Sequence, residues 1–166
     1  MDFIELIKKR RSVREFSDKP VAKDALEKIV DAARFAPTAR NVQPWEFVAV
    51  TGKEALRKTA AITEHGKFIA AAGACILVFS RDTKYFLEDC SGATVNAMLA
   101  AESLGIASCW VAGDKKDYAG ALNELFGVPA VFKLVSLIAL GYPASGDVFR
   151  AADKRAVAEV LHWEKF

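Results

Sequence analysis

The feature that most constrains the fold is an uninterrupted apolar run at residues 74–79, Ala-Cys-Ile-Leu-Val-Phe. The run has the length of a strand and leaves neither of its faces polar, which is the pattern of a strand covered on both sides. We therefore predict a strand over residues 74–79 that is buried on both faces.

Around this run, segments with helical and strand-like spacing of apolar residues follow one another in an irregular order. Helices are predicted at residues 3–10, 21–36, 53–61, 88–104 and 116–126, and further strands at residues 45–50, 106–111 and 133–141. The order lacks the strict strand–helix–strand alternation of a doubly wound fold. It favours the α+β class, with a mainly antiparallel central sheet flanked by helices.

The length and composition fit one domain over residues 1–166. A chain of 166 residues, 52% of them hydrophobic, buries roughly 70% of its unfolded surface. No repeat, low-complexity tract or linker divides it. The longest uncharged runs, residues 68–80 and 134–146, are about 13 residues long, against the ~20 that a membrane-spanning helix needs. The start, Met-Asp-Phe-Ile-Glu, has no apolar leader, so we expect a cytoplasmic protein.

The long helix predicted at residues 88–104 has an unusually small face. Ala93, Ala97, Ala100 and Ala101 would let a neighbouring element approach closely. This pattern fits either a helix in the core or the seam of a dimer, and it does not separate the two.

A cluster of cations follows the first predicted helix. Five cations at residues 8–14 surround one hydroxyl, although the whole chain carries a net charge of only +2. We call these residues the basic cluster: Lys8, Lys9, Arg10, Arg11, Ser12 and Arg14. Guanidinium groups and a hydroxyl bind phosphate oxygens well, which favours an anion site. Cations also suit the negative end of a helix, so a solvated helix terminus is the alternative interpretation.

A second polar stretch, residues 37–43, follows the second predicted helix, and we call it the polar loop. Pro37 opens this loop and a further proline follows it, so a rigid segment presents the hydroxyl of Thr38 and the amides of Asn41 and Gln43. It lies directly before the strand predicted at residues 45–50.

Gly113 follows the strand predicted at residues 106–111. A glycine there permits either close approach of the backbone to a ligand or a tight turn.

The side chains that could support other chemistry are scattered. Cys75, Cys90 and Cys109 form no CxxC pair, and only His65 and His162 could add imidazole ligands, which argues against a metal site. Neither histidine lies near a nucleophile in a motif, and Cys90 and Cys109 have no obvious partner that would stabilise a thiolate. We therefore predict no metal site and no Ser-His-Asp or Cys-His arrangement.

Several stretches together resemble the nitroreductase family. Arg-Arg-Ser-Val-Arg at residues 10–14, Ala-Pro-Thr-Ala-Arg-Asn-Val-Gln-Pro-Trp at 36–45 and Gly-Ile-Ala-Ser-Cys-Trp at 105–110 occur in the order, and at roughly the separations, of that family. Glu-Asp-Cys-Ser at 88–91 and Glu-Val-Leu-His-Trp at 159–163 extend the resemblance over nearly the whole chain. The resemblance implies a three-layer α/β/α sandwich that binds FMN. It also implies an obligate homodimer, with its seam on the long central helix and each FMN contacted by both chains.

The resemblance also implies roles for individual residues. Arg10 and Ser12 would hold the phosphate and ribityl chain of FMN, and Arg14 would face the pyrimidine edge of the flavin, where a fixed cation stabilises the reduced form. The polar loop would come from the partner subunit, and the backbone at residues 112–113 would offer an N–H to flavin N5. The cofactor-binding residues implied in this way are Arg10, Arg11, Ser12, Arg14, Pro37, Thr38, Asn41, Gln43, Ala112, Gly113, Lys154 and Arg155.

Three places depart from the family pattern. Thr38 replaces the usual serine and keeps its hydroxyl. Residues 64–74 lack the amide and proline pattern of the family, which leaves Lys67 and His65 as candidates for a flavin contact, with an exposed loop position as the alternative for His65. Lys154 and Arg155 are the nearest match to a basic pair that reaches the phosphate, and a solvated pair is the alternative.

The activity that the resemblance implies is hydride transfer from NADH or NADPH through FMN to a flat, electron-poor acceptor, such as a nitroaromatic or a quinone, in a ping-pong cycle. The chain is short for the family, so we expect an open site over the flavin. One alternative is another flavin reaction on the same fold, such as reductive dehalogenation or flavin fragmentation. A second is a non-redox dimer that binds nucleotides or nucleic acid through the basic cluster. The isoelectric point of about 8.4, which is only mildly basic, and the absence of a second basic stripe in the sequence disfavour this alternative.

Overall fold

The computed structural model describes residues 2–145 and 153–166 of the chain. In this part of the chain, the α-helices are α1 (Phe3–Lys9), α2 (Lys23–Ala33), α3 (Lys53–Ile62), α4 (Phe86–Ser103) and α5 (Ala119–Phe126). The strands are β1 (Trp45–Val50), β2 (Ala74–Arg81), β3 (Ala107–Ala112) and β4 (Phe132–Gly141). Short 3-10 turns are η1 (Ala39–Asn41), η2 (Lys67–Ala71) and η4 (Val157–Glu159).

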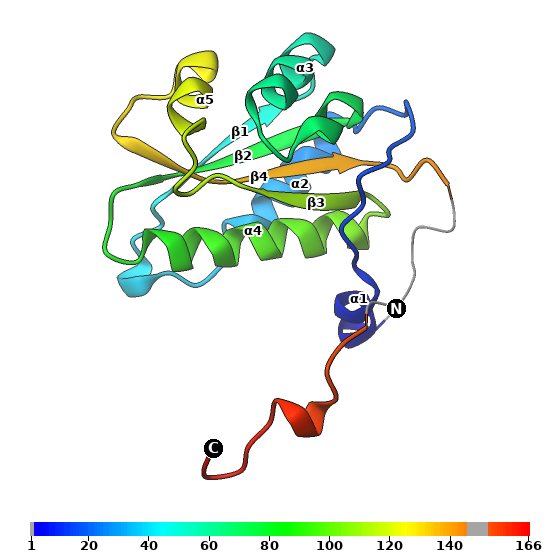
Figure 1. Cartoon of the computed structure of the whole chain (residues 1–166), viewed down its shortest axis with the longest axis vertical. Coiled ribbons are helices and arrows are strands. Elements are labelled where there is room, and N and C mark those ends of the chain that lie inside the picture. The colour runs from blue at the N-terminus through cyan, green and yellow to red at the C-terminus, as the bar shows by residue number, and fades with distance from the viewer. Residues whose placement is uncertain (1, 146–152) are drawn as a thin grey trace.

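The sheet lies between two layers of helices (Figure 1). Helices α2 and α4 cover one face, and α3 and α5 cover the other. Residues 153–166 extend away from the sheet, beyond α1 and the layer that contains α4. The three-layer arrangement that the resemblance implies is therefore confirmed.

The described strands form one sheet in the order β1–β2–β4–β3, and each neighbouring pair is antiparallel. This confirms the α+β class with an antiparallel central sheet. The predicted strand at residues 74–79 is also confirmed, because β2 lies between β1 and β4 and its residues 74–80 are all buried. Strands β1 and β3 form the two edges of the sheet.

Two helices each have one end that lies three residues from the predicted bound, whereas the other bounds differ by two residues or fewer. The helix predicted at residues 116–126 begins only at Ala119, because the preceding residues form turns, in which the Lys116 N–H donates to the Gly113 carbonyl oxygen and the Ala119 N–H donates to the Lys116 carbonyl oxygen. The helix predicted at residues 21–36 covers Lys23–Ala33, and Ala22 before it is still extended. The single domain predicted over residues 1–166 stays a prediction, since residues 1 and 146–152 lie outside the described part.

Each face of the sheet has its own apolar cluster. Ile76 and Ile138 point to the side of α2 and α4, where they pack with Ile29 of α2. Leu77 points to the opposite side, where it packs with Leu56 of α3. All five side chains are fully buried, and burying one such side chain contributes about 1.5–3 kcal/mol. The apolar run of β2 therefore serves both clusters at once.

The small face of α4 belongs largely to the core. Ala93, Ala97 and Ala101 are buried in the cluster under α2 and α4, whereas Ala100 is half-buried. The core interpretation of these alanines is thus confirmed, and the dimer seam on this helix stays a prediction. Helix α4 has 18 residues, yet neither it nor another described helix is long and apolar enough to cross a membrane.

A buried pair of hydroxyls joins α4 to β4. The Oγ atoms of Thr94 and Ser136 lie 2.8 Å apart, and both residues are fully buried. Thr94 Oγ1 also donates to the carbonyl oxygen of Cys90 at 2.7 Å, so Ser136 acts as the donor of the pair.

We expect Thr94→Val to lower the free energy of unfolding by about 1–3 kcal/mol, because the hydroxyl of Ser136 would stay buried without its partner. Adding Ser136→Ala should recover part of this loss, which a double-mutant cycle in urea measures. Ser103→Ala removes an exposed hydroxyl from the same helix and should cost less than about 0.5 kcal/mol. A loss for Thr94→Val no larger than for this control would show that the pair contributes nothing.

Candidate functional site

The candidate site begins where the N-terminal segment meets the outer edge of β3. Ser12 forms a parallel bridge with Ser108, and the Val13 N–H donates to the Ser108 carbonyl oxygen with an N–O distance of 3.0 Å. Val13 itself is 1% exposed, so it anchors the segment in the core. The pairing places the basic cluster beside the first residues of β3.

The arginines of the basic cluster differ in their surroundings. Arg11 Nη1 donates to the carbonyl oxygens of Lys8 and Arg10, at 2.5 and 2.7 Å, which caps the end of α1. Arg10 Nη1 is buried and has no hydrogen-bond partner among the described residues, and the same holds for Ser108 Oγ. The helix-end interpretation therefore suits Arg11, whereas Arg10 has the free, buried donor of an anion site.

A fit to an anionic ligand follows from the state of Arg10. A buried donor without an acceptor costs about 1–3 kcal/mol, and more when it is charged. A phosphate oxygen would supply the missing acceptor in a charge-assisted hydrogen bond. The residues present therefore fit a phosphate group at this edge of the sheet.

Three of the predicted site residues, Arg10, Ser12 and Arg14, lie close enough to the thiol of Cys109 to affect its pKa. Burial raises the pKa of Cys109, while the charge of Arg14, the hydroxyl of Ser12 and the charge of Arg10 act in the opposite direction. The expectation that Cys109 has no partner able to stabilise a thiolate was wrong, because the partners come from a segment distant in sequence. Since burial dominates and the pKa is raised, the thiol is still not an activated nucleophile.

A pocket of about 230 Å³ opens along β3 beyond Cys109. Arg14 lies at this pocket, with its guanidinium carbon 5.8 Å from the centre of the half-buried Phe68 ring. Trp110 and Tyr118 also line it. The pocket thus combines a cation with aromatic surfaces, which suits a flat ligand that carries negative charge.

The direction of the backbone N–H groups at the end of β3 determines which of residues 112 and 113 can donate to a ligand. The Gly113 N–H donates to the Val135 carbonyl oxygen at 3.1 Å, so it points into the sheet. The backbone groups of successive residues in a strand point to alternate sides. The carbonyl oxygen of Ser108 points outward, toward Val13, and Ala112 lies four residues further along the strand. The N–H and C=O of Ala112 therefore also point outward. Ala112 is therefore the member of the predicted pair that can offer an N–H.

Packing rather than ligand approach accounts for the glycine at 113. A Cβ atom there would lie 2.6 Å from Cγ of Leu134 and 3.0 Å from the backbone carbon of Val135. The first distance is shorter than real Cβ contacts and the second is tight, so a side chain at residue 113 would have to displace Leu134 and crowd the backbone of β4.

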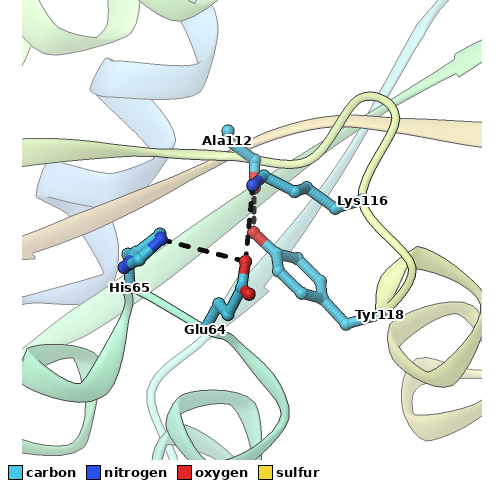
Figure 2. Close-up of polar contacts among 5 residues, drawn as sticks. All are labelled: Glu64, His65, Ala112, Lys116 and Tyr118. Atoms are coloured by element: carbon cyan, nitrogen blue, oxygen red, sulfur yellow. Dashed lines mark hydrogen bonds and ion pairs between the residues drawn. The ribbon is translucent and has the colours of Figure 1, made fainter.

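Polar side chains from the segment after α3 and the segment after β3 lie close together (Figure 2). Glu64 Oε2 lies 3.5 Å from Lys116 Nζ and 3.8 Å from His65 Nε2. The Tyr118 hydroxyl donates to the Ala112 carbonyl oxygen. Burial, followed by the negative charge of Glu64, raises the pKa of Tyr118, so the hydroxyl keeps its proton.

The structure separates the two candidates from residues 64–74. His65 lines the pocket beside Arg14, although its side chain is largely exposed. Lys67 Nζ instead donates to the carbonyl oxygens of Ala60 and Ala61, at 3.2 and 3.0 Å, and so caps the end of α3. His65 is therefore the better placed of the two.

Sequence reasoning missed Glu64, Lys116 and Tyr118. They come from the segment after α3 and the segment after β3, which are distant in sequence and are joined by the ion pair between Lys116 and Glu64. No motif links them, and the positive φ of Lys115 that orients the second segment leaves no mark in the sequence.

The polar loop is strained. Arg40, Asn41 and Gln43 have φ values of 56°, 55° and 49°, in the left-handed region that non-glycine residues rarely adopt. Such strain persists only where surrounding contacts impose it, and it concentrates at functional sites.

Two anchors impose this conformation. The buried carboxylate of Asp89, in the first turn of α4, accepts the Ala39 N–H at 3.1 Å. Arg81 Nη2, at the end of β2, donates to the carbonyl oxygens of Val42 and Gln43 at 3.1 and 3.2 Å. Within the loop, Thr38 Oγ1 accepts the Gln43 N–H at 3.2 Å, so the hydroxyl that replaces the family serine is used internally.

The polar loop and the basic cluster lie at opposite ends of α4. Lys9 Nζ lies 3.9 Å from Oε1 of Glu102 near the last turn of the helix, whereas Asp89 holds the loop at the first turn. A rise of ~1.5 Å per residue puts about 20 Å between Asp89 and Glu102. The two predicted halves of the site therefore do not touch within one chain.

The predicted basic pair near the C-terminus is exposed. Arg155 Nη2 donates to the Glu159 carbonyl oxygen at 2.5 Å and caps η4, and Lys154 is exposed beside it. Within one chain this arrangement suits the alternative of a solvated pair. Among the residues that the structure describes, no group of three His, Cys, Asp or Glu side chains could hold a metal ion.

We expect Asp89→Ala to loosen the polar loop and to lower the free energy of unfolding by about 1.5–3 kcal/mol, the range for a hydrogen bond to a charged group. Amide hydrogen exchange should become faster at Ala39, which loses its acceptor. Glu88→Ala, which removes an exposed carboxylate from the same helical turn, is the matched control. Equal exchange at Ala39 in the two variants would contradict the anchoring role of Asp89.

Comparisons with known proteins cover the whole site. The model of the Nitroreductase family matches residues 7–71 and 63–142. A relative from Archaeoglobus fulgidus, provisionally named an NADH dehydrogenase/NAD(P)H nitroreductase, is 37% identical over 98% of each chain.

The solved structure of an FMN-dependent nitroreductase from Clostridium difficile R20291 has a TM-score of 0.91 at 29% identity and covers 98% of this chain and 99% of its own. A provisionally named nitroreductase in complex with FMN, from Desulfovibrio desulfuricans, has a TM-score of 0.86 at 26% identity over 100% of this chain and 98% of its own. Because the matched residues include the basic cluster, the polar loop and the edge of β3, this chain belongs to the nitroreductase family.

Proposed function

We propose that this protein is an FMN-dependent oxidoreductase that transfers hydride from NADH or NADPH to a flat, electron-poor acceptor such as a nitroaromatic or a quinone. The observation that carries the proposal is the buried Arg10 Nη1 without an acceptor, beside Ser12 at the edge of β3. The relatives that bind or depend on FMN support the choice of cofactor.

The residues of the β3 edge would each take one part of the cofactor. Arg10 and Ser12 would hold the phosphate end, where cations and a hydroxyl meet anionic oxygens. Arg14 would lie at the pyrimidine edge, where its charge stabilises the negative charge that develops on reduction. Ala112 would offer its outward N–H. When bound, FMN supplies the two-electron redox chemistry, by accepting hydride from the donor and passing it to the acceptor.

A homodimer would complete this site. The polar loop lies about 20 Å from the basic cluster along α4 of the same chain, and a second copy related by a two-fold axis across α4 would bring its loop to the cluster. Exposed apolar side chains support such an interface, since contiguous ones mark association surfaces. On α1 and in the C-terminal segment they are Phe3, Ile4, Ile7, Val157, Val160, Leu161, Trp163 and Phe166.

The direct test combines a spectrum, a mass and a turnover assay. The purified protein should show the absorption of oxidised flavin, release FMN on denaturation and have the mass of a dimer. Oxidation of NADH or NADPH should then depend on a nitroaromatic or quinone acceptor. FMN binding without such turnover would favour another flavin reaction on this fold, whereas a colourless protein that refuses FMN would favour a non-redox phosphate-binding dimer.

We expect Arg10→Ala to weaken FMN binding by about 10- to 100-fold, as the loss of a charge-assisted hydrogen bond worth about 1.5–3 kcal/mol implies. FMN occupancy after extensive dialysis and titration of the FMN-free protein measure the effect. Arg57→Ala removes an exposed guanidinium from α3 and serves as the control. Undiminished occupancy in Arg10→Ala would remove this residue from the phosphate site.

We expect Arg14→Ala to lower the reduction potential of bound FMN and to slow hydride uptake by about tenfold, a change of about 1.4 kcal/mol in the barrier. The cause is the loss of positive charge beside the reduced ring system. Arg14 is exposed, so the melting temperature should stay close to that of the unmodified protein. An unchanged potential would contradict the place assigned to Arg14.

A further inference from the structure

The last residue of β3 is held from outside the sheet. Ala112 ends an edge strand, and its outward carbonyl oxygen accepts the hydroxyl of Tyr118. On the inner side, the N–H groups of Gly113 and Asp114 both donate to the Val135 carbonyl oxygen at 3.1 Å. The strand end is thus clamped between β4 and one tyrosine hydroxyl.

Tyr118 is itself fixed by its surroundings. It stands directly before α5, its ring is half-buried, and it lines the pocket that also contains Arg14. The ion pair between Lys116 and Glu64 ties the segment before α5 to the segment after α3. Because burial and the charge of Glu64 raise the pKa of Tyr118, its hydroxyl stays a donor throughout the neutral range.

We infer that Tyr118 is a positioning residue, which holds the end of β3 through the Ala112 carbonyl so that the Ala112 N–H is presented to the atom of the cofactor that receives hydride. This inference rests on the proposed function. In an extended residue the N–H and C=O point the same way, and they are linked through the φ and ψ of that residue. A contact that keeps the Ala112 carbonyl directed outward therefore restrains these two angles and, with them, the direction of the Ala112 N–H. A donor misplaced by as little as 1 Å loses much of its effect on a reacting atom.

Tyr118→Phe removes only the hydroxyl. In the protein without FMN, the amide exchange of Gly113 should become about fivefold faster, as expected for a strand end that loses one hydrogen bond of about 1 kcal/mol. In the protein loaded with FMN, hydride uptake from NADH or NADPH in stopped flow should slow about fivefold to tenfold. The dissociation constant of FMN should change by less than about twofold, since the phosphate contacts are untouched.

Tyr142→Phe is the matched control. It deletes the same atom from a half-buried tyrosine whose ring lies 3.9 Å from Lys19 Nζ, away from the pocket. It should alter neither the exchange of Gly113 nor the rate of hydride uptake.

A second variant separates positioning from general stiffening. Ala112→Pro deletes the N–H itself, and proline is tolerated on an edge strand where the N–H points outward. If Tyr118 acts through this N–H, adding Tyr118→Phe to Ala112→Pro should slow hydride uptake no further, although each change alone slows it. Independent effects that multiply would overturn the inference.

The remaining outcomes are also decisive. Faster exchange of Gly113 in Tyr118→Phe with unchanged hydride uptake would show a purely structural role and overturn the inference, while the proposed function would stand. Unchanged exchange and unchanged uptake would overturn it as well. Failure of the unmodified protein to bind FMN would instead remove the proposed function, and the positioning role with it.

Discussion

The pairing of residues 12 and 13 with β3 is the interaction on which the rest of the site depends. The antiparallel order β1–β2–β4–β3 leaves β3 at an edge, and an edge strand presents backbone groups that need partners. The Val13 N–H satisfies the Ser108 carbonyl, and the buried Val13 side chain keeps the segment against the core. Arg10 and Arg14, on either side of Val13, are carried to the same edge as a consequence.

Electrostatics then distinguishes the members of the basic cluster. Arg11 donates to the carbonyl oxygens at the end of α1 and places a positive charge at the negative end of the helix. A cation at a helix end commonly has this role. Arg10 Nη1 is buried without an acceptor among the described residues. Burying a charged group in this way costs free energy of folding, and an anionic ligand would offset that cost. Nearby, the pKa of Cys109 stays raised despite two guanidinium groups, so this thiol does not neutralise their charge. The positive charge remains available for a ligand.

Local patterns in the sequence predicted most of the fold and part of the site. The apolar run of β2, the alanine face of α4 and the cations at residues 8–14 are each visible within one stretch, because burial and helix ends leave a local signature. The convergence on Cys109, the contact of Tyr118 with Ala112 and the internal use of the Gly113 N–H are not visible. These contacts depend on the order of the strands and on which residues of β3 direct their backbone groups outward. Both are set by pairing between segments that are distant in sequence.

The division of the site along α4 has a thermodynamic consequence for the proposed dimer. Each ligand would touch the basic cluster of one chain and the polar loop of the other, so neither chain alone offers the full set of contacts. Ligand binding and association then favour each other, because a ligand that binds only the dimer removes dimer from the dissociation equilibrium. The strained polar loop fits this arrangement. Asp89 and Arg81 hold its left-handed residues in place within one chain, so the loop can meet a ligand of the other chain without an additional ordering cost.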